Sequence, residues 1–283
     1  MNHLLVSGDH DLPLLSTPTL TTVQLLVLSK TSQLVALPAA VFALTHLRTL
    51  HVFLNASLVH IGAELGQLTS LRNLAVTKNP ALRSVPRELG RLTALVRLDL
   101  SEQLLEHLPD SVGCLRALEH LVVCGNRLTR LPASVGDCAA LTTLSLDNNA
   151  LCELPNAVGR LTRLERLALR NNRLAWLPSS LSALQGAGLR VWLHGNPLLP
   201  GIGTRLAFFD ADYRFMHQTL AATSSVAMIR ERATEICIAL QDLTLPAPLL
   251  IEIIDADVPL AEQVRWGAKW QLVVIVKHRL QQR

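Results

Sequence analysis

The most regular feature of the chain is a repeated order of apolar and polar positions, which reads LxxLxLxxN. The clearest example begins at Leu141 with LTTLSLDNN, and its neighbour begins at Leu164 with LERLALRNN. Successive units begin 24, 24, 24, 23, 23, 23 and 24 residues apart, at Val23, Leu47, Leu71, Leu95, Leu118, Leu141, Leu164 and Gly188. Self-similarity at this period predicts a solenoid in which copies of one structural unit stack on each other.

Positions within a unit are counted here from its first residue. Positions 4 and 6, such as Leu144 and Leu146, alternate with polar residues, which predicts a short strand with both leucines facing inward. Stacked units would pair these strands into a parallel sheet. Residues 4–12, LLVSGDHDL, match a degenerate earlier unit, because Leu4, Val6 and Asp9 occupy the corresponding positions.

Position 9 is usually asparagine, whose side-chain amide both donates and accepts hydrogen bonds. We expect this amide to satisfy the backbone of the turn that follows each strand. Thr31 and Gln103 replace it in two units and are expected to do so only in part. The asparagines are Asn55, Asn79, Asn126, Asn149, Asn172 and Asn196.

A Leu-Pro pair follows the asparagine in most units, as in Leu131-Pro132 and Leu154-Pro155. Proline fixes the backbone and suits the first position of a helix, so a helical turn should begin there. A glycine precedes the last apolar residues of five units, at Gly66, Gly90, Gly113, Gly136 and Gly159.

This pattern resembles the leucine-rich-repeat family in its intracellular 23-residue form and is similar to Ras-binding leucine-rich-repeat scaffolds, over about residues 4–200. The resemblance implies an α/β solenoid with a concave parallel sheet, protein binding as the usual activity, and no cofactor. We predict three regions: a degenerate N-terminal repeat at 1–22, the solenoid at 23–200 and a helical tail at 201–283.

The tail is expected to contain helices at about 226–241, 248–256 and 261–280, with residues 198–204 as a linker. One interpretation is that these helices cap the exposed apolar end of the solenoid. The other starts from the segment IRERATEICIALQDLTLPAPLL, which resembles the elongin-binding box of ubiquitin-ligase substrate receptors. Met228 and Ala233 depart from that pattern. This second interpretation predicts a substrate-recognition adaptor that recruits a ligase through its tail.

Composition bears on the class of partner and on the cellular compartment. The chain is 49% hydrophobic and 17% charged, which is enough to build a core, and its net charge of +4 includes no run of lysine or arginine. We therefore predict no nucleic-acid partner. Its five cysteines form no CxxC pair, and neither a signal peptide nor a membrane span is indicated. A monomeric, cytoplasmic protein with no membrane association is expected.

Candidate chemistry is sparse. No phosphate-binding loop, nucleophile elbow or zinc-protease helix occurs. His46 and His51 lack a third ligand, Cys237 lies between two isoleucines, and Cys124 is expected on the concave face without an evident base. The sequence therefore predicts no catalytic residue, no metal and no enzymatic activity.

The repeat register does predict a binding surface. Positions 2, 3, 5, 7 and 8 should face the concave side, where the last two units carry arginine and tryptophan, the residue types that most often dominate binding energy. An acidic protein partner would suit this surface, whose residues are Arg166, Arg170, Arg190, Trp192 and His194.

Two alternatives to that surface are open. The arginines can be simply solvated while Trp192 packs on the C-terminal cap. A second, more apolar group also faces the concave side at the other end of the solenoid and consists of Leu25, Val27, His51, Phe53 and Leu54.

Overall fold

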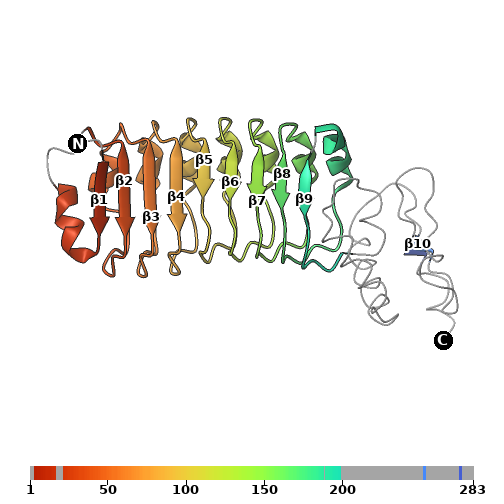
Figure 1. Ribbon diagram of the computed structural model, residues 1–283, viewed down its shortest axis with the longest axis horizontal. Helices are drawn as coiled ribbons and strands as arrows, with labels where there is room; N and C mark the ends of the chain where they lie inside the picture. Colours follow the sequence, from red (N-terminus) through yellow and green to blue (C-terminus); the bar gives the residue numbers. More distant parts are fainter. Residues whose placement is uncertain (1–2, 17–21, 188, 199–250, 253–273, 276–283) are drawn as a thin grey trace. The chain divides into compact units, whose positions relative to one another are not determined.

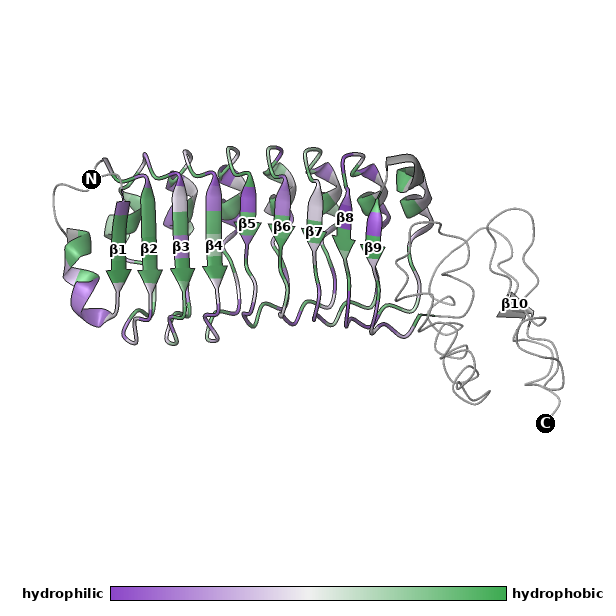
Figure 2. Cartoon of the chain, in the orientation of Figure 1, coloured by the Kyte–Doolittle hydropathy of each residue, from purple (hydrophilic) through white to green (hydrophobic). Residues whose placement is uncertain are grey.

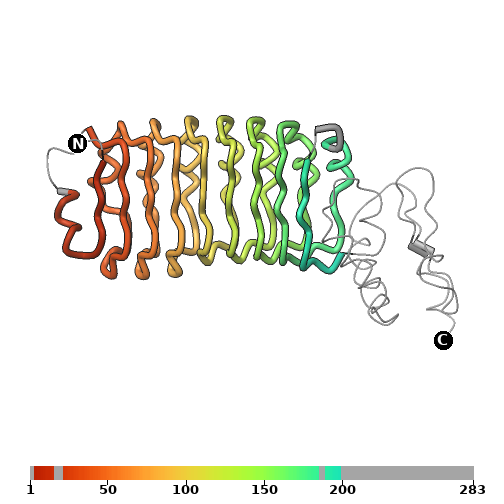
Figure 3. Tube along the Cα trace, viewed as in Figure 1, coloured from red at the N-terminus to blue at the C-terminus, as the bar shows by residue number. Residues whose placement is uncertain are grey.

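The computed structural model describes residues 3–16, 22–187, 189–198, 251–252 and 274–275. The chain divides into two compact units, Met1–Tyr213 and Arg214–Arg283. In the first unit, the described residues form one parallel sheet of nine strands in chain order, with short helices behind it (Figure 1). Figure 3 shows how the chain completes one coil per repeat before starting the next strand.

Each strand pairs with the next at equivalent repeat positions, so Leu144 lies beside Leu167 and Val6 beside Leu28. The first four strands have five residues each and the last five have three. The strands are β1 (His3–Ser7), β2 (Leu25–Ser29), β3 (Thr49–Phe53), β4 (Asn73–Thr77), β5 (Arg97–Asp99), β6 (His120–Val122), β7 (Thr143–Ser145), β8 (Arg166–Ala168) and β9 (Arg190–Trp192).

The other side of each coil carries a short helix, usually a single 3₁₀ turn. Several of these begin directly after the proline of the Leu-Pro pair, for example after Pro132 and Pro155, which confirms the predicted start. The helices are η1 (Asp9–Ser16), α1 (Ala39–Phe42), η3 (Ala63–Gln67), η4 (Arg87–Arg91), η5 (Asp110–Cys114), η6 (Ala133–Asp137), η7 (Asn156–Arg160) and η8 (Ser179–Ala187).

The repeated glycines allow these turns to stack closely. A Cβ atom added to Gly90 would lie only 2.6 Å from the backbone oxygen of Ser111 in the next coil, and one on Gly159 would lie 2.5 Å from that of Ser180. Such contacts are shorter than van der Waals separation, so a side chain at these positions would push neighbouring coils apart.

The core lies between the sheet and the helices and is filled mainly by leucine. Leu144 and Leu146 are fully buried, as are Leu167 and Leu169 in the next coil, which confirms the inward direction predicted for positions 4 and 6. The opposite face of the sheet, made of positions 3, 5 and 7, is the concave face.

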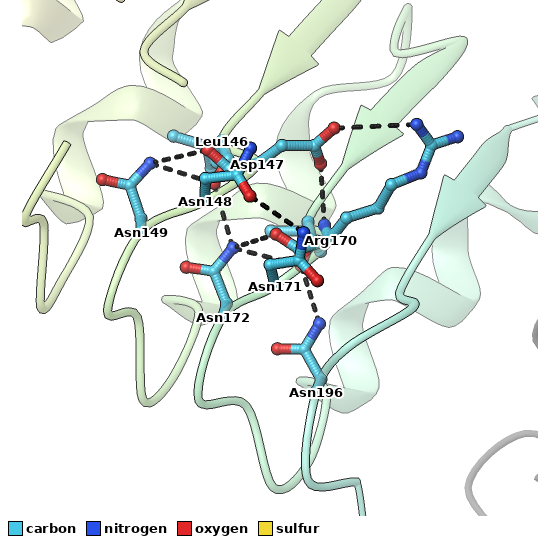
Figure 4. A network of polar contacts seen from close by, with 9 residues as sticks. Leu146, Asp147, Asn148, Asn149, Arg170, Asn171, Asn172 and Asn196 are labelled. Atoms are coloured by element: carbon cyan, nitrogen blue, oxygen red, sulfur yellow. Dashed lines mark hydrogen bonds and ion pairs between the residues drawn. The ribbon is translucent and has the colours of Figure 1, made fainter. Parts of the chain in front are cut away.

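A ladder of side-chain amides runs through the turns that follow the strands (Figure 4). The Asn172 Oδ1 atom accepts a hydrogen bond from the Leu151 backbone N–H at 3.1 Å. Its Nδ2 group donates to the backbone oxygens of Leu146, Leu169 and Arg170 at 2.9, 3.1 and 3.2 Å. Asn172 therefore joins two successive coils, and its predicted role in satisfying the turn backbone is confirmed.

The two substitutions in the ladder behave differently. The longer amide of Gln103 accepts from the Asn79 backbone N–H at 3.1 Å and donates to the Val76 backbone oxygen at 2.8 Å. Its predicted partial role is therefore wrong, because the extra methylene still allows both kinds of bond. Thr31 has only a hydroxyl, which donates to the Asn55 Oδ1 atom at 2.7 Å.

The ladder changes its pattern along the chain. The amide oxygens of Asn55, Asn79 and Gln103 accept from position 9 of the preceding coil, as in the bond from the Asn55 backbone N–H to Asn79. From Asn126 onward the amide oxygen accepts instead from the N–H at position 11 of the preceding coil, two residues after position 9. The first of these bonds joins the Leu105 N–H to Asn126. The change coincides with the shortening of the strands and with the first 23-residue spacing.

The residue before each asparagine-ladder position has a left-handed backbone conformation, with positive φ. In the first coils the residues with this conformation are Lys30, Leu54, Lys78 and Glu102, whose φ angles lie between 56° and 59°. From β6 onward glycine or asparagine takes the position, at Gly125, Asn148, Asn171 and Gly195. Non-glycine residues occupy this region at a cost of roughly 1–2 kcal/mol each, so the ladder must outweigh it.

In the tail, the structure describes two short parallel strands, β10 (Ile251–Glu252) and β11 (Val274–Ile275). Both fall within segments expected to be helical, so that prediction is wrong at these four residues. Three of them are β-branched, which favours a strand. The expected helix at 226–241, the cap and the segment that begins at Ile229 lie outside the described residues.

Asn172→Leu tests the ladder. It keeps side-chain bulk but leaves buried backbone groups without partners, each worth about 1–3 kcal/mol. We expect the free energy of unfolding in urea to fall by at least about 3 kcal/mol. Arg160→Lys, at a side chain that is 71% exposed, should change it by less than about 0.5 kcal/mol. Equal stability of the two variants would contradict the assigned role.

Candidate binding surface on the concave face

The two strands at the C-terminal end of the sheet bring like charges together. Arg166 in β8 and Arg190 in β9 are register partners, as the repeat predicted. Both side chains are exposed, and among the described residues neither forms an ion pair with a carboxylate. The Arg166 Nε–H donates to the Thr143 hydroxyl at 3.1 Å, which holds this guanidinium over β7. The sheet therefore presents two uncompensated guanidinium groups side by side.

Trp192 extends this surface along β9. It pairs in register with Ala168. The Arg170 guanidinium carbon lies 5.7 Å from the Trp192 ring centroid, within the range of a cation–π contact. Arg170 and Trp192 thus form a stacked pair next to Arg166 and Arg190.

Asp147 is a member of this surface that the sequence analysis missed. Its Oδ1 atom accepts from the Arg170 backbone N–H at 2.7 Å, and its Oδ2 atom lies 3.9 Å from the Arg170 Nη1 atom (Figure 4). Both residues occupy position 7, so a comparison of equal positions in neighbouring units would have found the pair. Arg170 is therefore partly neutralised, and the surface holds two unpaired guanidinium groups rather than three.

Burial affects the pKa of Asp147 more strongly than its contact with Arg170 does. Its side chain is only 18% exposed. Burial raises the pKa of Asp147 above its ordinary value, and the hydrogen bond and charge of Arg170 only partly oppose this. The Arg170 guanidinium therefore contacts both Asp147 and the Trp192 ring.

His194 lies at the margin of the surface. Its side chain is exposed, and its backbone oxygen accepts from the Asn171 N–H at 2.7 Å. Asn171 in turn donates from its side chain to Asn148 at 2.8 Å, which continues the stacking of these turns (Figure 4). All five predicted residues therefore belong to neighbouring coils at one end of the concave face.

The second predicted group lies at the other end, on β2 and β3. Figure 2 shows that β2 is hydrophobic along its length, whereas β8 and β9 begin with hydrophilic residues. Leu25, Val27, His51 and Phe53 are half-buried, and Leu54 is 45% exposed. The sequence analysis omitted Leu5, which pairs with Val27 and is 61% exposed. The concave face therefore changes from apolar at β1–β3 to cationic at β8–β9.

Burial disfavours the thiolate form of two cysteines, Cys124 and Cys138. Cys124 is half-buried on the concave face, and burial raises the pKa of its thiol, with further contributions from Asp147 and Asp99. Burial also raises the pKa of Cys138 to about 11. A nucleophilic cysteine needs the opposite shift. Within the described residues, no three His, Cys, Asp or Glu side chains gather as a metal site would require.

The geometry agrees with the comparisons to known proteins. Residues 116–174 match the family model described as leucine rich repeat. The fold is a leucine-rich-repeat solenoid. A comparison with curated protein sequences gave no significant match.

Several solved structures share the fold. A leucine-rich-repeat protein of Leptospira interrogans is 25% identical, with a TM-score of 0.57 over 74% of this chain and 59% of its own. An internalin of Listeria monocytogenes is 20% identical, with a TM-score of 0.54 over 67% and 54%. A plant peptide hormone receptor in complex with RGF2 is 23% identical, with a TM-score of 0.51 over 69% and 42%. The chain thus spans less than two thirds of the length of these proteins.

The leucine-rich-repeat fold typically serves in protein interaction, which supports a protein-binding role in general. Fold alone does not determine a partner, so the partner must be argued from the surface. No helix in the described part of the chain is long and apolar enough to cross a membrane.

Alkylation with iodoacetamide tests the thiol environments. At pH 8 a thiol of pKa about 11 is only about one thousandth ionised, and the thiolate is the reactive form. Cys138 in the folded protein should therefore react at least about 100-fold more slowly than the exposed Cys114 and Cys152. Peptide mass spectrometry would measure the rates, and equal labelling of Cys138 and Cys152 would contradict the buried position of Cys138.

Proposed function

We propose that this protein is a non-enzymatic, cytoplasmic scaffold that binds an acidic protein partner on the concave face at β8 and β9. The observation that carries the proposal is the register pairing of Arg166 with Arg190 without a compensating carboxylate in the described residues. Like charges side by side on a sheet are unfavourable, and a bound carboxylate would relieve that repulsion.

The chemistry of the surface favours a protein over a small molecule. Arginine can hold a carboxylate through two parallel hydrogen bonds. Trp192 adds a half-buried aromatic face beside these groups, and aromatic and arginine side chains commonly form the energetic centre of protein interfaces. Asp147 holds Arg170 against that ring, so part of the surface is ordered before a partner arrives. Less ordering on binding means a smaller entropic cost.

The solved structures support the same class of function. The plant peptide hormone receptor is described in complex with RGF2, and its solenoid resembles this chain in fold. That likeness supports the binding of a polypeptide by a protein of this fold. It does not carry over the hormone itself, because the identity between the two chains is only 23%.

The double variant Arg166→Glu/Arg190→Glu tests the site. Reversing both charges should abolish capture of the acidic partner, because attraction becomes repulsion while the exposed side chains leave the core unchanged. Affinity purification from the source cells, quantified by mass spectrometry, would compare the variant with the wild type. Capture by the wild type should also weaken as salt rises, since exposed charges are screened within roughly 8–10 Å.

The matched control is Arg83→Glu/Arg130→Glu, which changes the net charge equally at two exposed residues outside the sheet. It should retain the partners that the first variant loses. Retention of the same partners by a folded Arg166→Glu/Arg190→Glu protein would show that binding occurs elsewhere.

Trp192→Ala tests the apolar part of the surface separately. Removing the ring deletes the contact with Arg170 and the aromatic area next to the two arginines. Affinity for the partner identified above should fall by at least about 2 kcal/mol, or roughly 30-fold, if the ring is an energetic centre. Isothermal titration calorimetry would measure it, and an unchanged affinity would remove Trp192 from the site.

A further inference from the structure

An open hollow of about 710 Å³ lies at the edge of the solenoid where β2, β3 and β4 begin. Figure 1 shows this edge at the start of each strand arrow, away from β8 and β9. Its lining residues come from two rows that precede the strands. Gln24, Arg48 and Arg72 form one row, and His46 and Ser70 belong to the other.

Backbone hydrogen bonds fix the spacing of the first row. The Arg48 N–H donates to the Gln24 oxygen at 2.8 Å, and the Arg72 N–H donates to the Arg48 oxygen at 2.8 Å. The two arginines therefore start from adjacent coils, about 4.8 Å apart as in any parallel pair. Both residues are exposed and line the same hollow.

The positive charge is local to this hollow. Position 2 of the repeat holds Arg48 and Arg72 here, then Val96, and it holds Glu119 and Glu165 further along the same edge. In the part of the chain that the structure describes, neither Arg48 nor Arg72 forms an ion pair. Stacking places these two like charges side by side, which is unfavourable without a bound anion.

We propose that this hollow binds a phosphate monoester carried by a side chain of a protein partner. A phosphate monoester carries close to two negative charges near pH 7 and three acceptor oxygens. Two guanidinium groups on adjacent coils match that charge, and each can give parallel hydrogen bonds to two oxygens. A single carboxylate would neutralise only one of them.

The polar lining supplies further donors. Ser70 and Gln24 line the same hollow as the arginines, and a hydroxyl and a side-chain amide can each donate to a phosphate oxygen. The hollow is open to solvent rather than enclosed, so a phosphorylated side chain can enter from a polypeptide that lies across the edge. No residue of this site belongs to the β8–β9 surface, and the proposal does not depend on that surface.

Fluorescence anisotropy with the full chain tests the proposal. The probe is a labelled peptide library with a central phosphoserine and randomised flanking residues, compared with otherwise equal serine and glutamate libraries. The phosphoserine library should bind at least about tenfold more tightly than the glutamate library, because only the dianion engages both arginines. Arg48→Glu/Arg72→Glu should abolish this preference.

Two matched variants separate the hollow from general charge. Arg116→Glu/Arg163→Glu makes the same charge change at exposed arginines outside the hollow, and Arg166→Glu/Arg190→Glu makes it on β8 and β9. Both should bind the phosphoserine library within about twofold of the wild type. Loss of binding in the β8–β9 variant alone would overturn the assignment to the hollow, whereas failure of that surface to bind its own partner would leave this result unchanged.

Arg48→Lys/Arg72→Lys guards against a folding defect, because it keeps both charges and removes only the paired donors. It should still weaken phosphoserine binding by at least about threefold, since lysine cannot form the bidentate contact. Equal binding of the phosphoserine and glutamate libraries would overturn the proposal. Inorganic phosphate that binds as tightly as the phosphopeptides would also overturn the proposal, because it would indicate a free phosphate compound as the ligand.

Discussion

The rest of this structure depends on the hydrogen bonding of buried turn backbone by side-chain amides. Every coil must reverse direction after its strand, and the reversal buries N–H and C=O groups that no regular ladder can pair. Asn172 shows the solution, because one amide bonds to the strand end and the turn of the preceding coil and to the backbone of its own coil. The bonds also oppose the cost of the left-handed residue that precedes each ladder position.

This constraint explains why the surface of the protein is predictable at all. Because the amides hold each coil at one register, side chains at a given repeat position must stand beside one another on the sheet. The same rule places Arg166 beside Arg190 on β8 and β9 and Arg48 beside Arg72 at the strand-start edge. A structure with adjustable strands would relax such like-charge pairs apart. Here the stacking retains them, and an acidic or phosphorylated partner is the species that would benefit.

Much of the solenoid could be predicted from the sequence, because burial and repeat position coincide. Leu144 and Leu146 lie inward and Pro132 and Pro155 precede helical turns for reasons that each unit carries within itself. What escaped prediction depends on contacts between units. The full participation of Gln103 depends on the reach of its side chain across two coils.

The candidate sites also combine features that the sequence predicted with features that it did not. The pairing of Arg166 and Arg190 followed from the register, and the same comparison of position 7 in neighbouring units would have found Asp147 beside Arg170, but it was made only for the last two units. The hollow at Arg48 and Arg72 was missed because it is also lined by His46 and Ser70, which precede the first position of their units and so lie outside the predicted concave positions. In the tail no repeat constrains the local pattern, and β-branched Ile251 and Val274 lie in strands within segments that were expected to be helical.

Disulfide trapping across β8 and β9 tests the central claim, that stacking fixes which side chains are neighbours. In Arg166→Cys/Arg190→Cys, register partners would have Cα atoms about 4.8 Å apart, within the range that a disulfide spans. In Arg166→Cys/Trp192→Cys, the two-residue offset would separate them by roughly 8 Å, beyond that range. Oxidation followed by peptide mass spectrometry should reveal the 166–190 crosslink and little of the 166–192 crosslink. Preferential formation of the 166–192 crosslink, or equal formation of both, would contradict the register on which this account rests.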